Sequence, residues 1–583
     1  MIFVIIAGAV AYLATKDPNL SEVQVNIACA ALKAHDPGLY AGDGVFGDSG
    51  LWRFHTPMFQ SVLDLSLVPT GYADPTLPFR ILAGTTTLLF LGGMYALLYR
   101  QTRSWKMSAF VAVLAMTVTH TLGGAFWGVG PLKTITPPAI VQAMMPLIVL
   151  AYLHYEKRWQ LVLVFAFVGL IGNLHLVTAM NLTLILLLTY LARQRFAKSA
   201  WPVVAACAVT SLTAAVPYAL YYFGVRYQLT PLGAHTDPAA VARAFQVSDL
   251  ALLYPALLKN LLEWDLLVRV LAMGVIGAMV LLRLERFRVR DRGFWLFLTA
   301  ACLVVALGFQ GLSQFVGFLR GGSPPIVDFL RASALMMLPL YVLLAQGLVN
   351  LSRLWRAHRR LLGWTLALMA AAWILPSDSF TPARRQLYTL AGNVIKEDVQ
   401  PSRFATLRER AQRRQELHAI AQWARGDATD LATPPLSPPA PIDGEAATTE
   451  SAAEPPSPDG RPLFLTDQVE FRLHSRRAIL ATPEDVRFLY YLTPWRLEEW
   501  VRRYAQQQRI LFGTADNTEL AVFFRHLALQ HDLSAVSDYY VILDTTITAE
   551  KYPALEPVKS PRWGKYWKLY RVNKQHLAPN GSE

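Results

Sequence analysis

The sequence is poor in charge and nearly free of cysteine. Only 16% of its 583 residues are Asp, Glu, Lys or Arg, whereas 54% are hydrophobic, a composition too apolar for an ordinary soluble protein. The three cysteines, Cys29, Cys207 and Cys302, lie far apart, so their spacing predicts neither a disulfide framework nor a metal site. The C-terminal part has no Walker motif and no zinc-binding spacing. No internal repeat is present, which argues against a transporter built from duplicated halves.

Long apolar runs fill the first two thirds of the chain. Each is close to the length of about 20 residues that a membrane-spanning helix needs, or is a short or broken version of one. The runs lie at 2–15, 79–99, 107–127, 138–155, 160–173, 174–191, 201–223, 266–284, 293–310, 332–351 and 361–376. The sequence therefore predicts an α-helical polytopic membrane protein with about eleven spans.

Basic residues gather in every second connection between these runs. The basic connections are YRQTRSWK, EKRW, RQRFAK, RLERFRVRDR and SRLWRAHRR. Because cytoplasmic loops are enriched in Lys and Arg, these connections are predicted to be cytoplasmic. The net charge of +13 thus indicates topology, and no nucleic-acid partner is expected. The first run, MIFVIIAGAVAYLA, has no basic residues before it, so we interpret it as a spanning helix and not as a cleaved signal peptide.

The composition becomes that of a soluble protein after Pro376. The stretches PLFLTD, DYYVILDT and YWKLYRV favour strands, and PWRLEEWVRRYAQQQRI and NTELAVFFRHLALQHDL favour helices. Residues 426–461 are rich in Pro, Ala, Ser and Glu and are predicted to be a disordered insertion. We therefore expect a transmembrane domain at 1–376 with a long outer loop at 16–78. An α/β domain is expected at 377–583, on the periplasmic or extracellular side because the number of spans is odd.

The first outer loop contains HDPGLYAGDGVFGDSGLWRFHTP at residues 35–57. The whole layout resembles the GT-C type of integral-membrane glycosyltransferase, and HDPGLYAGD followed by LWRFHTP is similar to this loop in functionally undefined bacterial members. The resemblance implies an enzyme of the bacterial cytoplasmic (inner) membrane. Such an enzyme moves a sugar from a polyprenyl-phosphate donor to a glycan, lipid or protein acceptor. It also implies a catalytic acidic residue at Asp36 or Asp43, although the adjacent acidic pair of several such enzymes is absent here.

Transfer from a lipid phosphate needs a carboxylate near the acceptor hydroxyl and cations near the departing phosphate. Asp43 lies between glycines, where the backbone can approach a ligand closely, so we predict it as the general base, with Asp36 as its alternate. Both aspartates also stand in good turn sequences, in which the carboxylate bonds the local backbone. We expect that turn role for Asp48.

Candidate ligands for the phosphate lie in the outer connections. They are Arg331, Lys133, Arg53, His55 and His175. Arg331 opens a predicted span, where a lone cation can meet a lipid phosphate or simply extend to the interface. It can also pair with Asp328, three residues earlier, in a purely structural contact.

Two other functions remain open. A transporter or flippase of lipid-linked glycans would carry ionisable residues along the middle of its spans, where few are found. A non-catalytic assembly or scaffold protein would bind a partner through the outer domain, and its aspartates would only shape the loop. No cofactor is clearly indicated. Glu263 and Asp265 flank Trp264 before a predicted span, a position that favours anchoring at the membrane interface over catalysis, and a divalent metal stays open as the alternative.

Overall fold

The protein forms two compact units in its computed structural model. Unit 1 comprises Met1–Gln24, His55–Gln228 and Leu250–Val394, and unit 2 comprises Val25–Phe54, Leu229–Asp249 and Ile395–Glu583. The structure describes residues 2–16, 20–47, 52, 54–117, 119–120, 126–127, 135–230, 236–247, 291–319, 328–355, 358–374, 377, 380, 401–426, 455–456, 460–530, 536–549 and 552–577. The predicted division at 376/377 assigned the whole first loop to the transmembrane domain, whereas Val25–Phe54 belongs to unit 2.

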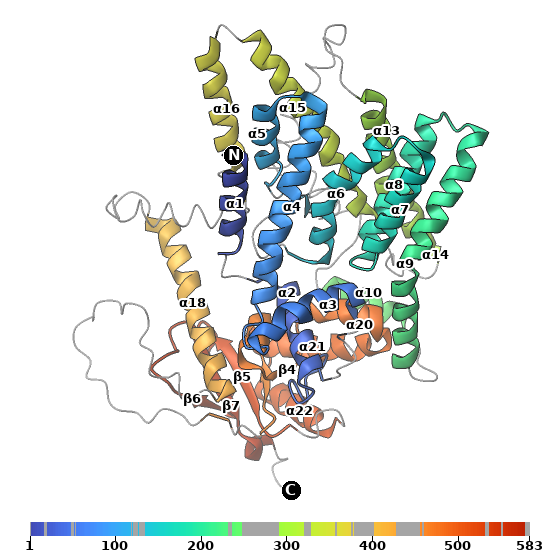
Figure 1. Cartoon of the computed structure of the whole chain (residues 1–583). Helices are drawn as coiled ribbons and strands as arrows, with labels where there is room; N and C mark the ends of the chain where they lie inside the picture. Colours follow the sequence, from blue (N-terminus) through green and yellow to red (C-terminus); the bar gives the residue numbers. More distant parts are fainter. Residues whose placement is uncertain are drawn as a thin grey trace. The chain divides into compact units, whose positions relative to one another are not determined.

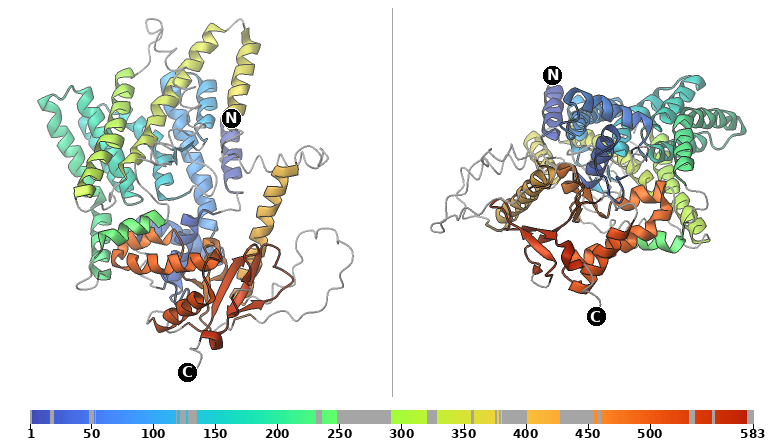
Figure 2. Two further views of the ribbon diagram at one scale, coloured as in Figure 1. Left: turned by 180° about the vertical axis from the view of Figure 1, so that it is seen from behind. Right: turned by 90° about the horizontal axis from the view of Figure 1, so that it is seen from below.

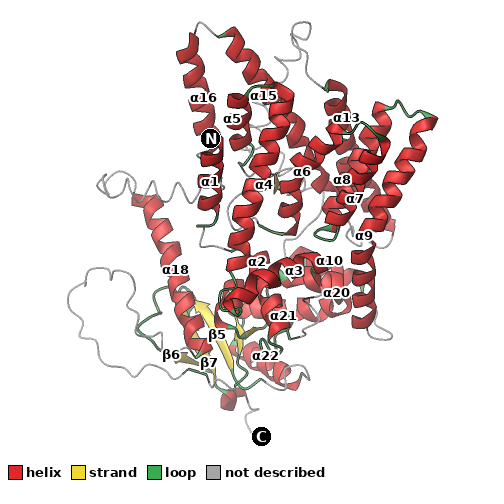
Figure 3. Cartoon of the chain, viewed as in Figure 1, coloured by secondary structure: helices red, strands yellow, loops and turns green. Residues whose placement is uncertain are grey.

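Unit 1 is helical (Figures 1 and 3). Its helices are α1 (Ile2–Ala14), α3 (Pro57–Leu67), α4 (Leu77–Thr102), α5 (Trp105–Leu114), α6 (Pro137–His154), α7 (Arg158–Ile171), α8 (Leu176–Arg193), α9 (Trp201–Leu229), α13 (Arg292–Leu303), α14 (Gln310–Leu319), α15 (Met337–Leu354) and α16 (Arg359–Ile374). A π-helical segment, η6 (Val304–Phe309), joins α13 to α14, and a 3-10 helix, η7 (Phe329–Met336), precedes α15. Helix α4 packs against α1, α5 and α6, and α8 packs against α13 and η7.

Six helical segments are long and apolar enough to cross a membrane. They are Leu77–Thr102, Pro137–His154, Leu176–Arg193, Lys198–Val225, Arg292–Leu319 and Phe329–Arg353. Shorter apolar helices occur at four more of the predicted runs, at Phe3–Ala14, Trp105–Leu114, Arg158–Ile171 and Arg360–Ile374. The protein is therefore a multi-pass membrane protein, and its count of spans stays a prediction.

One predicted span is wrong in part, and another cannot be compared. The run at 107–127 is helical only to Leu114. A short antiparallel pair of strands follows, β1 (Thr119–His120) and β2 (Phe126–Trp127). Polar and β-branched residues of the sequence TVTHT follow Leu114 and Met116, and such residues favour a helix less than the apolar residues before them. The predicted span at 266–284 lies outside the described residues.

Polar contacts join three of the basic connections at one end of unit 1. The Nη2 group of Arg100 donates a hydrogen bond to the carbonyl of Leu153 over 2.7 Å and lies 3.8 Å from the Asp291 carboxylate. Gln101 also donates to Asp291, over 3.2 Å. The connections after α4 and α6 and before α13 thus share one side, as the alternation of basic connections predicts. That this side is cytoplasmic stays a prediction.

Unit 2 is an α/β fold around a five-stranded sheet. The strand order is β4 (Ala478–Ile479), β3 (Leu463–Leu465), β5 (Tyr539–Asp544), β7 (Trp567–Val572) and β6 (Leu555–Val558). Strand β3 is parallel to β4 and β5, whereas β7 is antiparallel to β5 and β6. Its helices are α2 (Glu22–His35, from Val25 on), α10 (Pro238–Val247), α18 (Pro401–Arg425), α19 (Val469–Ser475), α20 (Asp485–Leu492), α21 (Leu497–Leu511) and α22 (Asn517–Leu529). The strands and helices expected in this region are present, and β4 and β6 are additional.

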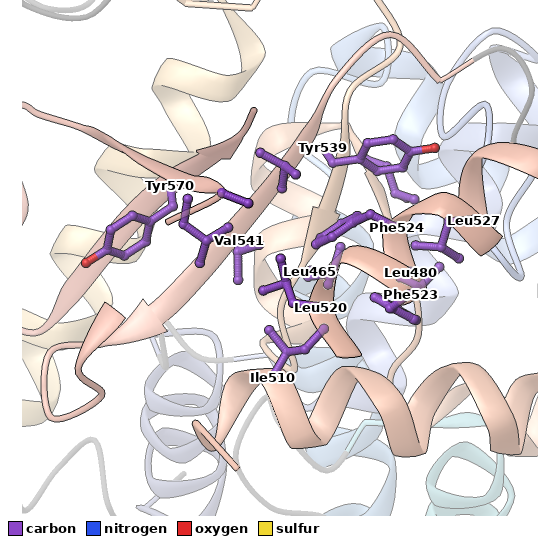
Figure 4. Close-up of a cluster of buried hydrophobic side chains, with 14 of the residues drawn as sticks. Leu465, Leu480, Ile510, Leu520, Phe523, Phe524, Leu527, Tyr539, Val541 and Tyr570 are labelled. Carbon is purple, nitrogen blue, oxygen red and sulfur yellow. The ribbon is translucent and has the colours of Figure 1, made fainter. Parts of the chain in front are cut away.

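Helices cover both faces of this sheet. Successive side chains of a strand point to opposite faces, so each strand contributes to both clusters. Leu463, Leu465 and Val541 pack on one face with residues of α21 and α22. Figure 4 shows Leu465 and Val541 in this cluster. Phe464 and Ile542 point to the other face and pack with residues of α18. Figure 2 shows the strands between α18 and the helices of the opposite face. Strands β3 and β5 are therefore buried at every position except the last of β5, Asp544.

Candidate functional site

The predicted general base, Asp43, is completely buried in unit 2 and forms an ion pair. Its Oδ1 accepts hydrogen bonds from the backbone N–H groups of Val45 and Phe46, each over 2.9 Å. Its Oδ2 accepts from the N–H of Ile479 over 3.0 Å. Arg472 of α19 donates to both carboxylate oxygens, from Nε to Oδ2 over 2.8 Å and from Nη2 to Oδ1 over 3.2 Å. The side chains of Asp43 and Arg472 are both inaccessible to solvent.

Arg472 is shared between three partners. Besides Asp43, it donates to the Asp485 carboxylate over 3.1 and 3.4 Å and to Oδ1 of Asn26 over 3.2 Å. Burial works to lower the pKa of Arg472, but the charges of Asp43 and Asp485 outweigh burial and raise that pKa above its ordinary value. Burial raises the pKa of Asp485. Asn26, Asp43, Arg472 and Asp485 form the Arg472 cluster, which fastens Val25–Phe54 to the rest of unit 2.

The Arg472 cluster leaves Asp43 no acceptor site for a substrate proton. A carboxylate offers about four lone-pair sites, and Asp43 accepts five hydrogen bonds. The flanking glycine serves close packing: a Cβ on Gly44 would lie 2.6 Å from the backbone oxygen of Leu480. The general-base role of Asp43 therefore stays a prediction that requires the cluster to open.

Asp36, the alternate base, is exposed. Its Oδ1 accepts a hydrogen bond from the N–H of Gly38 over 2.9 Å, which is the aspartate turn that the sequence allows. The carbonyls of Pro37 and Leu39 accept hydrogen bonds from Nζ of the buried Lys33, each over 2.7 Å. The turn is thus held from inside while the carboxylate of Asp36 faces outward. Asp48 lies outside the described residues.

Arg331 lies on η7 in unit 1 and pairs with Asp328. Its Nε donates to Oδ2 of Asp328 over 2.8 Å, so the structural contact foreseen in the sequence is present. The side chain is still 36% exposed. Among the described residues, we find no hydrogen bond to its two terminal Nη groups. These groups are therefore suitable for an anion, since a guanidinium can bind two oxygens at once.

Two histidines accompany Arg331 in unit 1, of which His55 is buried and His175 half-buried. His175 precedes α8, and its Nδ1 accepts a hydrogen bond from the N–H of Thr178 over 3.2 Å. Burial and the positive charge of Arg331 lower the pKa of His175 to about 3. Burial likewise lowers the pKa of His55 to about 3. The hydroxyl of Thr56, next to His55, donates to the carbonyl of Leu174 over 3.1 Å. Both imidazoles are therefore neutral near pH 7, so Arg331 supplies the charge here.

The other predicted site residues cannot be compared. Lys133 and Arg53 lie outside the described residues, as do Glu263 and Asp265. In the parts of the chain that the structure describes, no three His, Cys, Asp or Glu side chains are arranged to hold a metal ion.

Four buried polar residues with structural contacts were not predicted from the sequence: Arg472, Asp485, Asn181 and Gln310. Arg472 and Asp485 stand among other charged residues of unit 2, and Asn181 and Gln310 are single amides in apolar runs. A polar residue inside a predicted span is the one available signal, and it identifies Asn181 and Gln310.

Comparison with known proteins gives one distant structural match. No protein-family model and no curated protein matches the sequence. The structure is similar to the crystal structure of ArnT from Cupriavidus metallidurans in the apo state, with a TM-score of 0.37 and 12% sequence identity over 100% of this chain and 98% of that chain. A similarity this low does not place the chain in a family.

Proposed function

We propose that the protein is a membrane glycosyltransferase of the GT-C type that takes a sugar from a polyprenyl-phosphate donor. The observation that carries the proposal is Arg331. It is a partly exposed arginine at the start of an apolar helix, fixed through Nε by Asp328. Its terminal groups are suited to a phosphate, and a cation at this position stabilises the phosphate as the sugar leaves.

The neighbouring side chains fit this role. A neutral imidazole can donate one hydrogen bond and accept another, so His175 and His55 can bind a polar head group without adding charge. The general base in the proposal is Asp36 of unit 2, because its carboxylate is exposed and, among the described residues, accepts one hydrogen bond, from the N–H of Gly38. Asp43 is the alternate base if the Arg472 cluster opens. The sugar and the acceptor are not assigned.

The phosphate role is tested by direct binding. The full-length protein in detergent would be titrated with a polyprenyl monophosphate. Loss of a charge-assisted contact predicts that Arg331→Gln weakens binding by about 10- to 100-fold. Arg80→Gln is the matched control, because Arg80 also lies near the start of a long apolar helix and near an aspartate, 3.8 Å from Asp74. We expect the control to change binding by less than about twofold. Equal affinities for wild type and Arg331→Gln would refute the phosphate role.

The base is tested by transfer. Asp36→Asn keeps an oxygen for the N–H of Gly38 but cannot take a proton, so turnover should fall by about 10²- to 10⁴-fold with donor binding unchanged. Asp74→Asn is the matched control, because Asp74 makes the same kind of turn contact to the N–H of Thr76, over 2.9 Å. Wild-type turnover in Asp36→Asn would exclude Asp36 as the base.

A non-catalytic scaffold is the competing function, and the saturated carboxylate of Asp43 favours it. In that case both aspartates of the first loop serve only to shape it. A protein that binds polyprenyl phosphate yet transfers no sugar with any donor tested would support the scaffold or a transporter of lipid-linked glycans over the enzyme.

A further inference from the structure

We propose that Asn181 and Gln310 are positioning residues that hold Arg331 in place for a phosphate. The inference deepens the proposed function and rests on it. Neither amide forms a hydrogen bond with Arg331. Both act on the backbone at the start of η7, the helix that carries Arg331.

The two amides, on two different helices, form hydrogen bonds with the same peptide group. Nδ2 of Asn181, on α8, donates to the carbonyl of Asp328 over 3.1 Å. Oε1 of Gln310, the first residue of α14, accepts from the N–H of Phe329 over 2.9 Å. That carbonyl and that N–H belong to the same planar peptide unit, which joins Asp328 to Phe329. Bonding both of its sides fixes its position and its rotation.

Asp328 links this hydrogen-bonded peptide to the guanidinium of Arg331. The side chain of Asp328 starts at the residue whose carbonyl Asn181 holds, and its Oδ2 binds Nε of Arg331 over 2.8 Å. A bond to Nε orients the guanidinium, because Nε and the two Nη groups share one rigid plane. The amides on α8 and α14 therefore hold the 328–329 peptide, this peptide positions the Asp328 carboxylate, and that carboxylate positions Arg331.

The bonding of the two amides is only half complete. Asn181 is 3% exposed and Gln310 is 0% exposed. Among the described residues, Oδ1 of Asn181 and Nε2 of Gln310 have no hydrogen-bond partner. Apolar side chains of similar size would fill the same space without these unpaired amide atoms, but they would leave the carbonyl of Asp328 and the N–H of Phe329 without these partners. Filling the space alone therefore does not explain these residues. A need to fix the 328–329 peptide does.

The test compares polyprenyl monophosphate binding in four variants of the full-length protein in detergent. Asn181→Leu and Gln310→Met each remove one hydrogen bond to the 328–329 peptide. Each should weaken binding by about 3- to 10-fold, the usual effect of one net hydrogen bond. Gln310→Glu keeps an acceptor for the N–H of Phe329 and should restore most of the affinity. Asn350→Leu, at a buried amide of α15 elsewhere in unit 1, is the control and should bind as wild type. The melting temperature of every variant is measured alongside.

A double-mutant cycle with Arg331→Lys separates positioning from general damage. If the amides act through the guanidinium, their loss should weaken binding much less in the Arg331→Lys background, because lysine has no fork to orient. The same fold loss in both backgrounds, or wild-type binding in Asn181→Leu and Gln310→Met, would overturn the positioning role. If Arg331→Gln itself binds normally, then the proposed phosphate site fails as well.

Discussion

The Arg472 cluster should be a major source of stability for unit 2. Asp43 and Arg472 are both completely inaccessible to solvent. Removing one partner of a buried ion pair leaves the other charge uncompensated and typically costs about 3–5 kcal/mol. In Asp43→Asn the new amide group would also point N–H donors at the donors of Arg472 or Ile479. We therefore expect Asp43→Asn to destabilise unit 2 by about 3–5 kcal/mol.

The loss should appear as a lower melting temperature. For a domain of about 150–250 residues, 1 kcal/mol shifts the midpoint by about 2–4 °C, so Asp43→Asn should melt about 6–20 °C below wild type. Limited proteolysis should show faster cleavage in unit 2 than in unit 1. Asp36→Asn is the control in the same loop, and its exposed carboxylate with one backbone contact predicts a shift of only a few degrees.

Two outcomes would refute this reasoning. A melting temperature for Asp43→Asn equal to that of wild type would mean that the cluster contributes little to stability. A stable Asp43→Asn protein that binds donor but has lost turnover would restore Asp43 as the general base. If instead both stability and activity fall, a variant such as Arg472→Met should reproduce the loss, because it breaks the same pair from the other side.

Three further predictions concern topology, backbone packing and pH. A reporter fused after Ser377 should be active only outside the cytoplasm, because the basic connections alternate in phase from Arg100 to Arg360; activity inside would invalidate the predicted orientation. Gly44→Ala should destabilise unit 2 by about 1–3 kcal/mol in thermal melts, since the added Cβ would lie 2.6 Å from the oxygen of Leu480. Burial, with the nearby charges of His418 and Arg414, lowers the pKa of His474 to about 3. The unfolded chain binds that proton near pH 6.5, so unit 2 should lose stability as the pH falls from about 6.5 towards 3, and His474→Gln should flatten this dependence.

Most of the fold could be predicted from the pattern of apolar residues in the sequence. Runs of apolar residues predicted each long apolar helix that the described part of unit 1 contains. They do so because a helix in lipid needs apolar side chains where it faces the lipid. The stretches that form β3, β5 and β7 were predicted as strands from their residue pattern. Strands β3 and β5 are buried because helices cover both faces of the sheet. Strand β4 has only two residues, Ala478–Ile479, which is too short for a recognisable pattern.

Contacts between residues far apart in the chain could not be predicted from the sequence. Asp43 and Arg472 are separated by 429 positions, and neither charge nor spacing indicates that they meet. Loop composition predicted turns correctly at Asp36, where the partner is two residues away. It could not predict the Arg472 cluster, because a buried ion pair depends on packing between segments far apart in the chain.

The two aspartates of the first loop therefore differ in what they can do chemically, although their sequence contexts are similar. Two like groups in unlike environments commonly take different roles in a site. Asp43 is enclosed and saturated with donors, so it anchors the loop. Asp36 is exposed on a turn that Lys33 holds from inside, so it can meet an acceptor hydroxyl. Opening the Arg472 cluster should thus reduce transfer indirectly by loosening that turn, whereas Asp36→Asn should remove it directly at unchanged stability. A transfer rate that follows stability at both positions would favour the scaffold over the enzyme.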